Sequence, residues 1–283
     1  MSVRVVTDSG CDLPPALCDE LGIEVVPLTI RFGDEALVDR KDLTAPEFWA
    51  KCKTAPALPE TAAPSPGAFE EAYRRAQTGG AEGIVVVTLS RKMSATIEAA
   101  ELAAENLGSD LPCRVVDSAN ASLGEGMTVL LAAQAAAAGK SLDEVEEVAK
   151  SAARRTKLVA AIDTLDNQRR GGRIGGAQAM MGGLLSIKPL ITVSQVSGGE
   201  VAEAGKQRTR ARALTALVDS VRAIGPVEAL GVMHAEAPDV NELLDRLDDI
   251  VPREDIIVAD VGAVIGTHVG PGRIGVVTVG SDR

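Results

Sequence analysis

Residues 83–96 read GIVVVTLSRKMSAT, and this stretch is the clearest structural signal in the chain. Its first half, Gly83 to Leu89, is almost wholly apolar and rich in valine, which is typical of a strand buried on both faces. Its second half becomes polar and leads into an alanine-rich segment, so we expect a helix over residues 94–107. A buried strand followed by a helix is the repeating unit of a parallel sheet covered by helices.

The same alternation continues on both sides of this stretch. In the N-terminal half we expect strands at 3–7, 23–30, 83–88 and 113–117, and helices at 12–21, 42–52, 65–78, 94–107, 122–138 and 141–155. In the C-terminal half we expect strands at 157–163, 189–194, 200–204, 227–233, 255–260 and 274–279, and helices at 177–185, 208–223 and 238–250. The charged helix 141–155 separates the two series. We therefore predict two α/β domains, residues 1–155 with a mostly parallel sheet and residues 156–283 with a mixed sheet.

Composition and charge exclude several classes of protein. Aromatic residues make up 2% of the 283 residues and the net charge is −11, which argues against binding of nucleic acid. The longest weakly polar run, Met127 to Gly139, is too short for an integral membrane segment. The four cysteines form no C-x-x-C pair, so we expect neither a metal site nor a disulfide framework. The first residues lack the apolar core of a signal peptide, and we expect a cytoplasmic location.

Polar residues follow three of the expected strands. They are Thr7-Asp8-Ser9, the stretch Ser90 to Thr96, and Asp117-Ser118. In open α/β sheets ligands bind beyond the carboxyl ends of the strands, and helix N-termini there attract anions. The hydroxyls of Ser94 and Thr96 either cap the following helix, which is their commonest role, or hold an anionic ligand.

Two further residues suit an acidic ligand. Thr61 lies in a proline-punctuated loop between Pro59 and Pro64, which stiffens the backbone around its hydroxyl. His268 lies in what we interpret as a glycine-rich loop, residues 266–272. Each is an ordinary loop residue if read alone. Together with Ser94 they predict a site for a small acidic ligand.

Basic residues gather in two places of this acidic chain. One is the turn Arg169-Arg170-Gly171-Gly172-Arg173. The other is the stretch 206–212, in which Lys206, Arg208 and Arg210 lie at the start of an expected helix, where positive charge opposes the helix dipole. These stretches are either solvated surface or places where a partner or an anionic group docks.

Several enzyme motifs are absent. The chain has no G-x-x-x-x-G-K-[ST] loop, no G-x-G-x-x-G after a strand and no G-x-S-x-G elbow, so a built-in nucleotide cofactor is unsupported. A small-molecule phosphotransferase or hydrolase that uses Ser94 and His268, with Asp8 or Asp117 as the acid, remains an alternative. A third possibility is an interaction module that uses the basic turn.

An ordered set of motifs resembles the DegV family of bacterial fatty-acid-binding proteins over nearly the whole chain. The matching segments are 6–9 with 12–14, 59–66, 89–96, 117–118, 163–165 with 170–174, 188–189, and 268–272. The resemblance implies a two-domain α/β protein that encloses one long-chain fatty acid, such as palmitate, between its domains and needs no other cofactor. It also implies that Thr61 and Ser94 hold the carboxylate and that His268 belongs to the same polar network.

The resemblance implies a carrier that is not an enzyme. Some members present the bound acid to a separate ATP-dependent fatty acid kinase, so Arg170, Arg173, Lys206, Arg208 and Arg210 are candidates for docking that partner. The chain departs from the family pattern at three places. Ala62-Ala63 replace Ser-Gln, Ala95 replaces Gly, and Asn167-Gln168 replace an aromatic–aliphatic pair. The loss of polar groups at 62 and 63 is expected to alter the network around the carboxylate.

Overall fold

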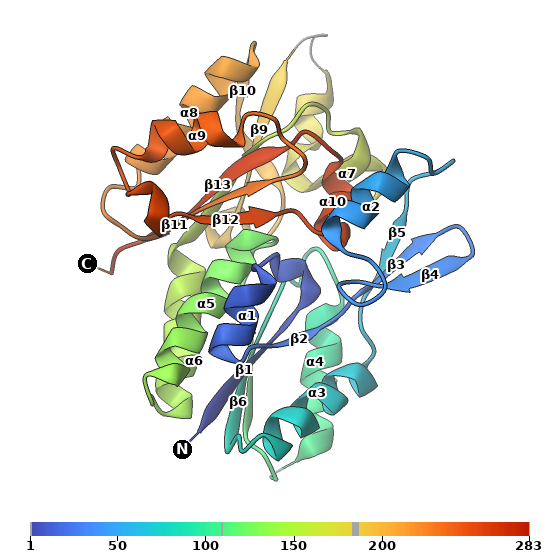
Figure 1. Ribbon diagram of the computed structural model, residues 1–283, viewed down its shortest axis with the longest axis vertical. Helices are drawn as coiled ribbons and strands as arrows, with labels where there is room; N and C mark the ends of the chain where they lie inside the picture. Colours follow the sequence, from blue (N-terminus) through green and yellow to red (C-terminus); the bar gives the residue numbers. More distant parts are fainter. Residues whose placement is uncertain (1, 109, 183–186, 283) are drawn as a thin grey trace.

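A computed structural model describes residues 2–108, 110–182 and 187–282. It contains two α/β domains, drawn one above the other in Figure 1, which confirms the predicted fold class. Helix α6 (Leu142–Arg155) runs directly into strand β8 (Thr156–Ala161), and we propose the domain boundary at this junction.

The N-terminal domain is built on a parallel four-stranded sheet. Its order is β2 (Glu24–Val26), β1 (Val3–Asp8), β6 (Gly83–Thr88) and β7 (Cys113–Asp117). Every residue of β6 is buried, as the valine run predicts. Side chains of a strand point alternately to opposite faces, so Val85 packs in the core beside α5 while Val86 packs in the core beside α3 and α4. The sheet is therefore covered on both sides.

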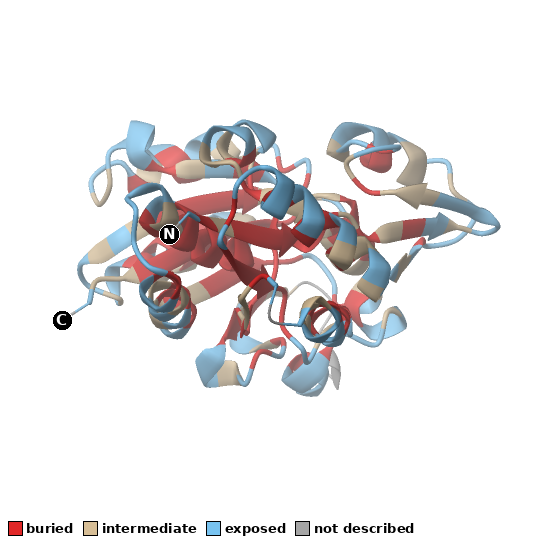
Figure 2. Cartoon of the chain, turned by 90° about the horizontal axis from the view of Figure 1, so that it is seen from below, coloured by how far each residue is buried: buried red, intermediate tan, exposed pale blue. Residues whose placement is uncertain are grey.

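Helices form the two outer layers of this domain (Figure 1). One face carries α1 (Pro15–Leu21), α5 (Leu123–Ala137) and α6, and the other carries α3 (Pro66–Thr78) and α4 (Thr96–Leu107). Figure 2 shows the buried strands running through the middle of the molecule between half-exposed helices.

The C-terminal domain contains a mixed six-stranded sheet. Its order is β10 (Ala202–Gln207), β9 (Lys188–Ser194), β8, β13 (Ile274–Gly280), β11 (Val227–His234) and β12 (Ile257–Asp260). Neighbouring strands are antiparallel except for β11 and β12, which are parallel. Helices α8 (Arg210–Arg222) and α9 (Val240–Leu247) pack on one face.

Helix α5 joins the two domains because it also packs against the second sheet. A side chain at Gly231 of β11 would come within 2.5 Å of Leu123 and Met127 on α5. Glycine lets α5 approach β11 closely, which brings the cores of the two domains together.

A small antiparallel sheet was not predicted. It consists of β4 (Glu35–Val38), β3 (Thr29–Phe32) and β5 (Glu60–Ala62). The expected single strand 23–30 is interrupted at Pro27, and a turn at Gly33, with φ of 60°, returns the chain as β4. The expected loop around Thr61 is strand β5. Short strands between prolines give little periodic signal, so the pattern alone missed this sheet.

Other boundaries also differ from the expectations. Residues 263–269 form helix α10 (Ala263–Val269), so His268 lies on a helix and not in a loop. Helix α4 begins two residues after Ser94, and its N-cap is Ala95, which has no side-chain acceptor. The helix expected at 177–185 is a 3-10 helix over Gly175–Gly182, and 183–186 lie outside the described residues. In the part of the chain that the structure describes, no helix is long and apolar enough to cross a bilayer.

Candidate functional site

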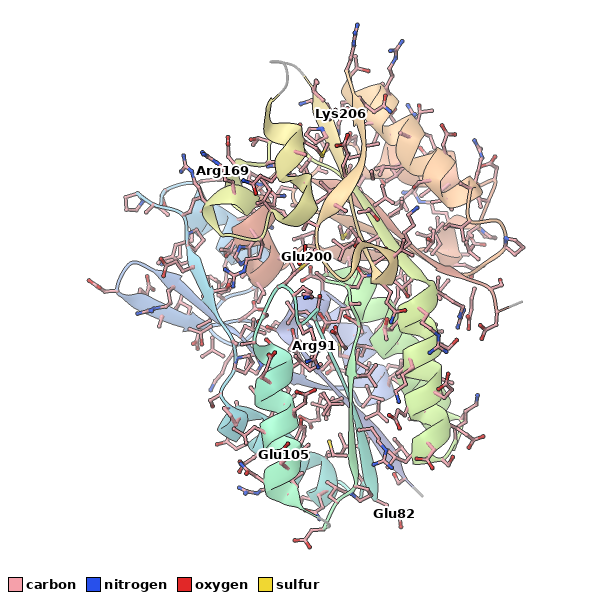
Figure 3. The ribbon with its side chains drawn as sticks, turned by 180° about the vertical axis from the view of Figure 1, so that it is seen from behind. Glu82, Arg91, Glu105, Arg169, Glu200 and Lys206 are labelled. Atoms are coloured by element: carbon pink, nitrogen blue, oxygen red, sulfur yellow. The ribbon has the colours of Figure 1, made fainter. Side chains whose placement is uncertain are left out.

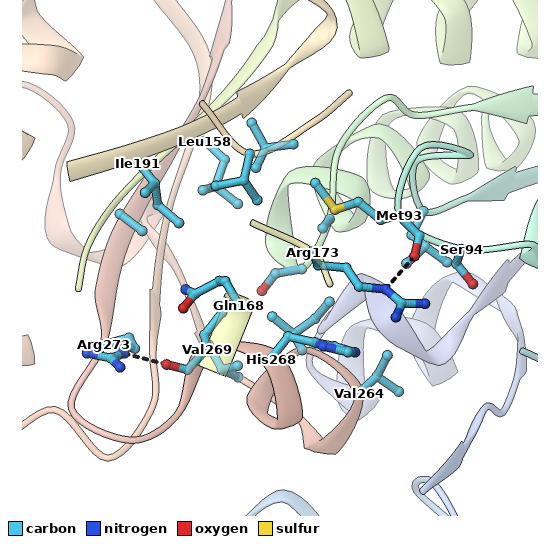
Figure 4. A pocket seen from close by; sticks show the side chains of 18 of the residues that line it. Met93, Ser94, Leu158, Gln168, Arg173, Ile191, Val264, His268, Val269 and Arg273 are labelled. Carbon is cyan, nitrogen blue, oxygen red and sulfur yellow. Dashed lines mark hydrogen bonds between the residues drawn. The ribbon is translucent and has the colours of Figure 1, made fainter. Parts of the chain in front are cut away.

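A cavity of about 250 Å³ lies where the two domains meet. Leu28, Leu89 and Met93 contribute to its wall from the N-terminal domain. Leu158 and Ile191 contribute from the second sheet, and apolar residues of α10 close another side. Figure 4 shows Met93, Leu158 and Ile191 around the site, with Arg173 between Leu158 and Ser94. The expected residues Thr61, Ser94 and His268 all line this cavity.

Thr61 and His268 are hydrogen-bonded to each other although 207 positions separate them in the sequence. Thr61 Oγ1 lies 3.0 Å from His268 Nε2. Strand β5 positions Thr61 through its pairing with Ile30 of β3, and α10, which carries His268, packs against both strands. The small antiparallel sheet therefore brings Thr61 into contact with His268.

Burial keeps the His268 imidazole neutral. The pKa of His268 is lowered from 6.5 to about 4, first because burial disfavours the charged ring and second because the Arg173 guanidinium is nearby. Among the described residues, Nδ1 of the ring has no hydrogen-bond partner. A side chain at Gly171 would come within 2.4 Å of this atom, so the glycine leaves the room that the ring occupies.

Ser94 stands at the uncapped end of α4. Its Oγ shares a hydrogen bond of 2.8 Å with Thr96 Oγ1, and it is half-buried at the cavity wall. The capping role is therefore wrong for Ser94, because it precedes the N-cap position. Arg173 holds this corner in place, since its Nε donates to the carbonyl of Met93 at 3.1 Å and its Nη1 donates to that of Gly171 at 2.6 Å.

An outer cleft of about 560 Å³ adjoins the cavity. Thr61, Arg173 and His268 line both, so the polar residues stand between the apolar interior and the surface. Arg170 lines the outer cleft and is exposed. This arrangement places the polar end of the cavity next to the outer cleft.

The second basic stretch lies elsewhere on the C-terminal domain. Lys206, on β10, and Arg208 are exposed, and Figure 3 shows Lys206 apart from Arg169, which lies at the end of α7 (Asp166–Arg170) and not in the turn expected there. Lys206 pairs with Glu203 at 3.4 Å. Arg210 makes two hydrogen bonds of 2.6 and 2.8 Å to Asp239, which neutralises the positive charge at the start of α8. The unfavourable interaction of Arg210 with the dipole of α8 is thus offset by the Asp239 carboxylate.

A hydrolytic triad is not assembled in the described part of the chain. Ser94 is bonded to Thr96 and His268 to Thr61, and no acid contacts His268 Nδ1 to orient the ring. Asp8 accepts hydrogen bonds from the backbone N–H groups of Gly10 and Leu89 instead. The geometry therefore suits ligand binding better than nucleophilic attack.

Gln168 and Arg273 were missed as cavity residues. Gln168, on α7 (Asp166–Arg170), is 1% exposed, and its polarity at a position where the resemblance expects an apolar residue was the available signal. Arg273 is 4% exposed and donates to the carbonyls of Val269 and Thr164. Burial lowers the pKa of Arg273 to about 10. Nothing in the sequence distinguishes this arginine from exposed ones.

A group of buried carboxyls lies in the N-terminal domain. Burial raises the pKa of Asp8 to about 6 and that of Asp12 to about 7, and it raises the pKa of Glu125 well above its ordinary value. Asp12 accepts hydrogen bonds from Ser122 Oγ at 2.5 Å and from the N–H of Gly262 at 3.0 Å. Gly262 is the N-cap of α10, so Asp12 links the first domain to the helix that carries His268.

Comparisons with known proteins agree over the whole length. The family model described as DegV family, uncharacterised protein, matches residues 2–280. A DegV domain-containing protein of Streptomyces coelicolor is 41% identical over 280 residues, with 97% of each chain covered.

Two solved structures are close in shape. A DegV family protein of Thermus thermophilus, described as binding fatty acid, is 34% identical with a TM-score of 0.89, and the match covers 99% of this chain and 100% of that one. A DegV family protein of Ruminococcus gnavus, refined with vaccenic acid, is 26% identical with a TM-score of 0.85, covering 98% and 99%.

Proposed function

This chain belongs to the DegV family, and from that premise we propose that it binds one long-chain fatty acid in the cavity between its domains. The observation that carries the proposal is the cavity itself, which is apolar along its wall and polar where Thr61, Ser94 and His268 meet. Relatives described as fatty-acid-binding proteins support the ligand class.

The polar end suits a carboxylate without a charged clamp. With the neutral His268 donating from Nε2 to Thr61 Oγ1, the Thr61 hydroxyl is free to donate to a carboxylate oxygen, and Ser94 can donate to the other. Hydroxyl donors hold an anion more weakly than a bidentate arginine does. The apolar tail supplies most of the affinity, since about 14 methylenes at ~0.8 kcal/mol each contribute on the order of 11 kcal/mol before the costs of binding.

The test is binding of palmitate by the delipidated protein, measured by calorimetric titration. Ser94→Ala should weaken binding by roughly 10- to 100-fold, because one hydrogen bond to a charged group is worth about 1.5–3 kcal/mol. Ser141→Ala, which removes the exposed N-cap of α6 and lines neither the cavity nor the outer cleft, is the control and should bind normally. Unchanged affinity in Ser94→Ala would remove this residue from the site, and absence of binding by the native protein would refute the proposed function.

We propose in addition that the bound acid is presented to a separate ATP-dependent kinase across the outer cleft, with Arg170 and Arg173 at the docking surface. The support is that Thr61 and His268 line both the cavity and this cleft, so a carboxylate there faces outward. Acyl phosphate can be trapped as the hydroxamate. The isolated chain with ATP should form none, whereas turnover that is lost in His268→Ala would favour the enzyme alternative.

A further inference from the structure

Gln168 places an amide in the wall of the cavity. It lies in the middle of α7, between the exposed Asp166 and Arg170. The helix turns its side chain inward, where Ile162 and Val269 are fellow members of the wall. The backbone around it is fixed, because the Gln168 carbonyl accepts a hydrogen bond from the N–H of Arg173 at 2.9 Å.

The amide of Gln168 has no hydrogen-bond partner among the residues that the structure describes. Both Oε1 and Nε2 are buried, and within residues 2–108, 110–182 and 187–282 neither atom makes a hydrogen bond. A buried amide in this state costs free energy, and native proteins rarely leave both atoms unsatisfied. Figure 4 shows Gln168 well apart from Ser94, so it does not belong to the group that meets the carboxylate there. It is therefore a second polar point in the same cavity.

The chemistry of an amide defines what this point would bind. Oε1 accepts a hydrogen bond and Nε2 donates one. A hydroxyl group can hydrogen-bond to both atoms, because it donates through its hydrogen and accepts through its lone pairs. A ketone or a second, ionised carboxylate would satisfy the donor alone, because neither has a hydrogen to donate to Oε1. Among single groups attached to an acyl chain, the hydroxyl matches best.

We propose that the cavity selects a long-chain fatty acid with a hydroxyl group on its acyl chain, and that Gln168 is the residue that determines this preference. The proposal rests on the proposed function, since it concerns the tail of the same ligand. A saturated tail that passes Gln168 leaves the amide unsatisfied, whereas a hydroxylated tail satisfies it. Sites built around a hydrogen bond to a substrate hydroxyl discriminate strongly against the analogue that lacks it.

Direct titration with matched acids tests the proposal. The probes are palmitate with 3-hydroxypalmitate, and stearate with 10-hydroxystearate and 12-hydroxystearate. The native protein should bind at least one hydroxylated acid about tenfold or more tightly than the plain acid of equal length. Gln168→Leu should reverse that order, by binding the plain acid more tightly and the hydroxylated acid more weakly. Gln168→Met, which keeps the length of the side chain, should behave in the same way.

Gln134→Leu is the matched control, because it makes the same change at an exposed position of α5 and should keep the native order. The proposal is overturned if no hydroxylated acid binds more tightly than its plain counterpart, or if both Gln168 variants keep the native ratio, as they would if a bound water satisfies the amide. Weaker binding of plain acids by Gln168→Leu would also overturn the proposal, because it would show that Gln168 binds the carboxylate. Failure of the native protein to bind any acid would instead refute the proposed function.

Discussion

At the scale of single residues, His268 depends on the absence of a side chain at Gly171. A Cβ at Gly171 would lie 2.4 Å from His268 Nδ1, which is closer than two such atoms can approach. Gly171 has an ordinary φ of −78°, so an alanine there would not strain the backbone and would act through the ring. The glycine therefore sets the position of the histidine and, through it, of the Thr61 hydroxyl.

We expect Gly171→Ala to weaken palmitate binding by roughly tenfold, because overpacking at a fixed site costs about 1–3 kcal/mol and displaces the ring. Gly176→Ala is the control, since the nearest atom to its Cβ would lie at an ordinary 3.7 Å. Titration calorimetry of both variants decides the matter. Equal affinity of the two would show that His268 does not hold the carboxylate network in place.

At the scale of secondary structure, the start of α8 shows how the chain compensates for a positive charge at a helix N-terminus, where it opposes the helix dipole. Arg210 pairs with Asp239, a side chain 13% exposed that precedes α9, and this joins the two helices on one face of the second sheet. Arg208, two residues earlier, is exposed. The two arginines look alike in the sequence but differ in role.

Arg210→Ala should lower the free energy of unfolding by about 1–2 kcal/mol, because it leaves the half-enclosed Asp239 carboxylate without its partner. Arg208→Ala should change it by less than about 0.5 kcal/mol, as expected of an exposed side chain. Urea unfolding of both variants measures the difference. If Arg208→Ala proved the more destabilising, the assignment of a structural role to Arg210 would be wrong.

The elements also show what could be predicted from the sequence. The valine run of β6 and the alanine-rich α4 carry strong periodic or apolar signals, so the parallel sheet and its helices were predictable. Strand β5 is three residues long, and α10 is a seven-residue helix with glycine at both caps. Neither is long enough to show a hydrophobic periodicity in the sequence. Thr61 and His268 were singled out by their proline- and glycine-rich surroundings, and the family resemblance gave them a role at the carboxylate. Their contact follows from packing between these two short elements, which no local pattern encodes.

At the scale of the whole molecule, the buried carboxyls couple folding to pH. The raised pKa values of Asp8, Asp12 and Glu125 mean that the folded chain keeps protons that the unfolded chain releases. Stability from these groups is present at pH 4 and is lost as the pH rises through about 6 and 7. His268 acts in the opposite sense, since its lowered pKa removes stability as the pH falls from 6.5 towards 4.

Glu125→Gln should therefore stabilise the protein more at pH 8 than at pH 5, by roughly 1–3 kcal/mol, because the neutral amide replaces a buried carboxyl whose ionisation opposes folding. Gln retains an oxygen to accept the hydrogen bond that Thr7 donates to Glu125 at 3.0 Å. Urea unfolding at pH 5, 6, 7 and 8 gives the slope, and Glu105→Gln on the exposed face of α4 serves as control. An identical slope in the native protein and Glu125→Gln would contradict this account.

The chain's single tryptophan rests on the helix that carries His268. Trp49, on α2 (Ala45–Cys52), is 4% exposed and donates from Nε1 to the carbonyl of Val261 at 3.2 Å, and its ring would meet a Cβ at Gly266 at 2.9 Å. With excitation at a wavelength that only tryptophan absorbs, the intrinsic fluorescence of the protein thus comes from one indole in contact with α10. A change in the position of that helix as the cavity fills is readable from the native emission spectrum, with no dye attached.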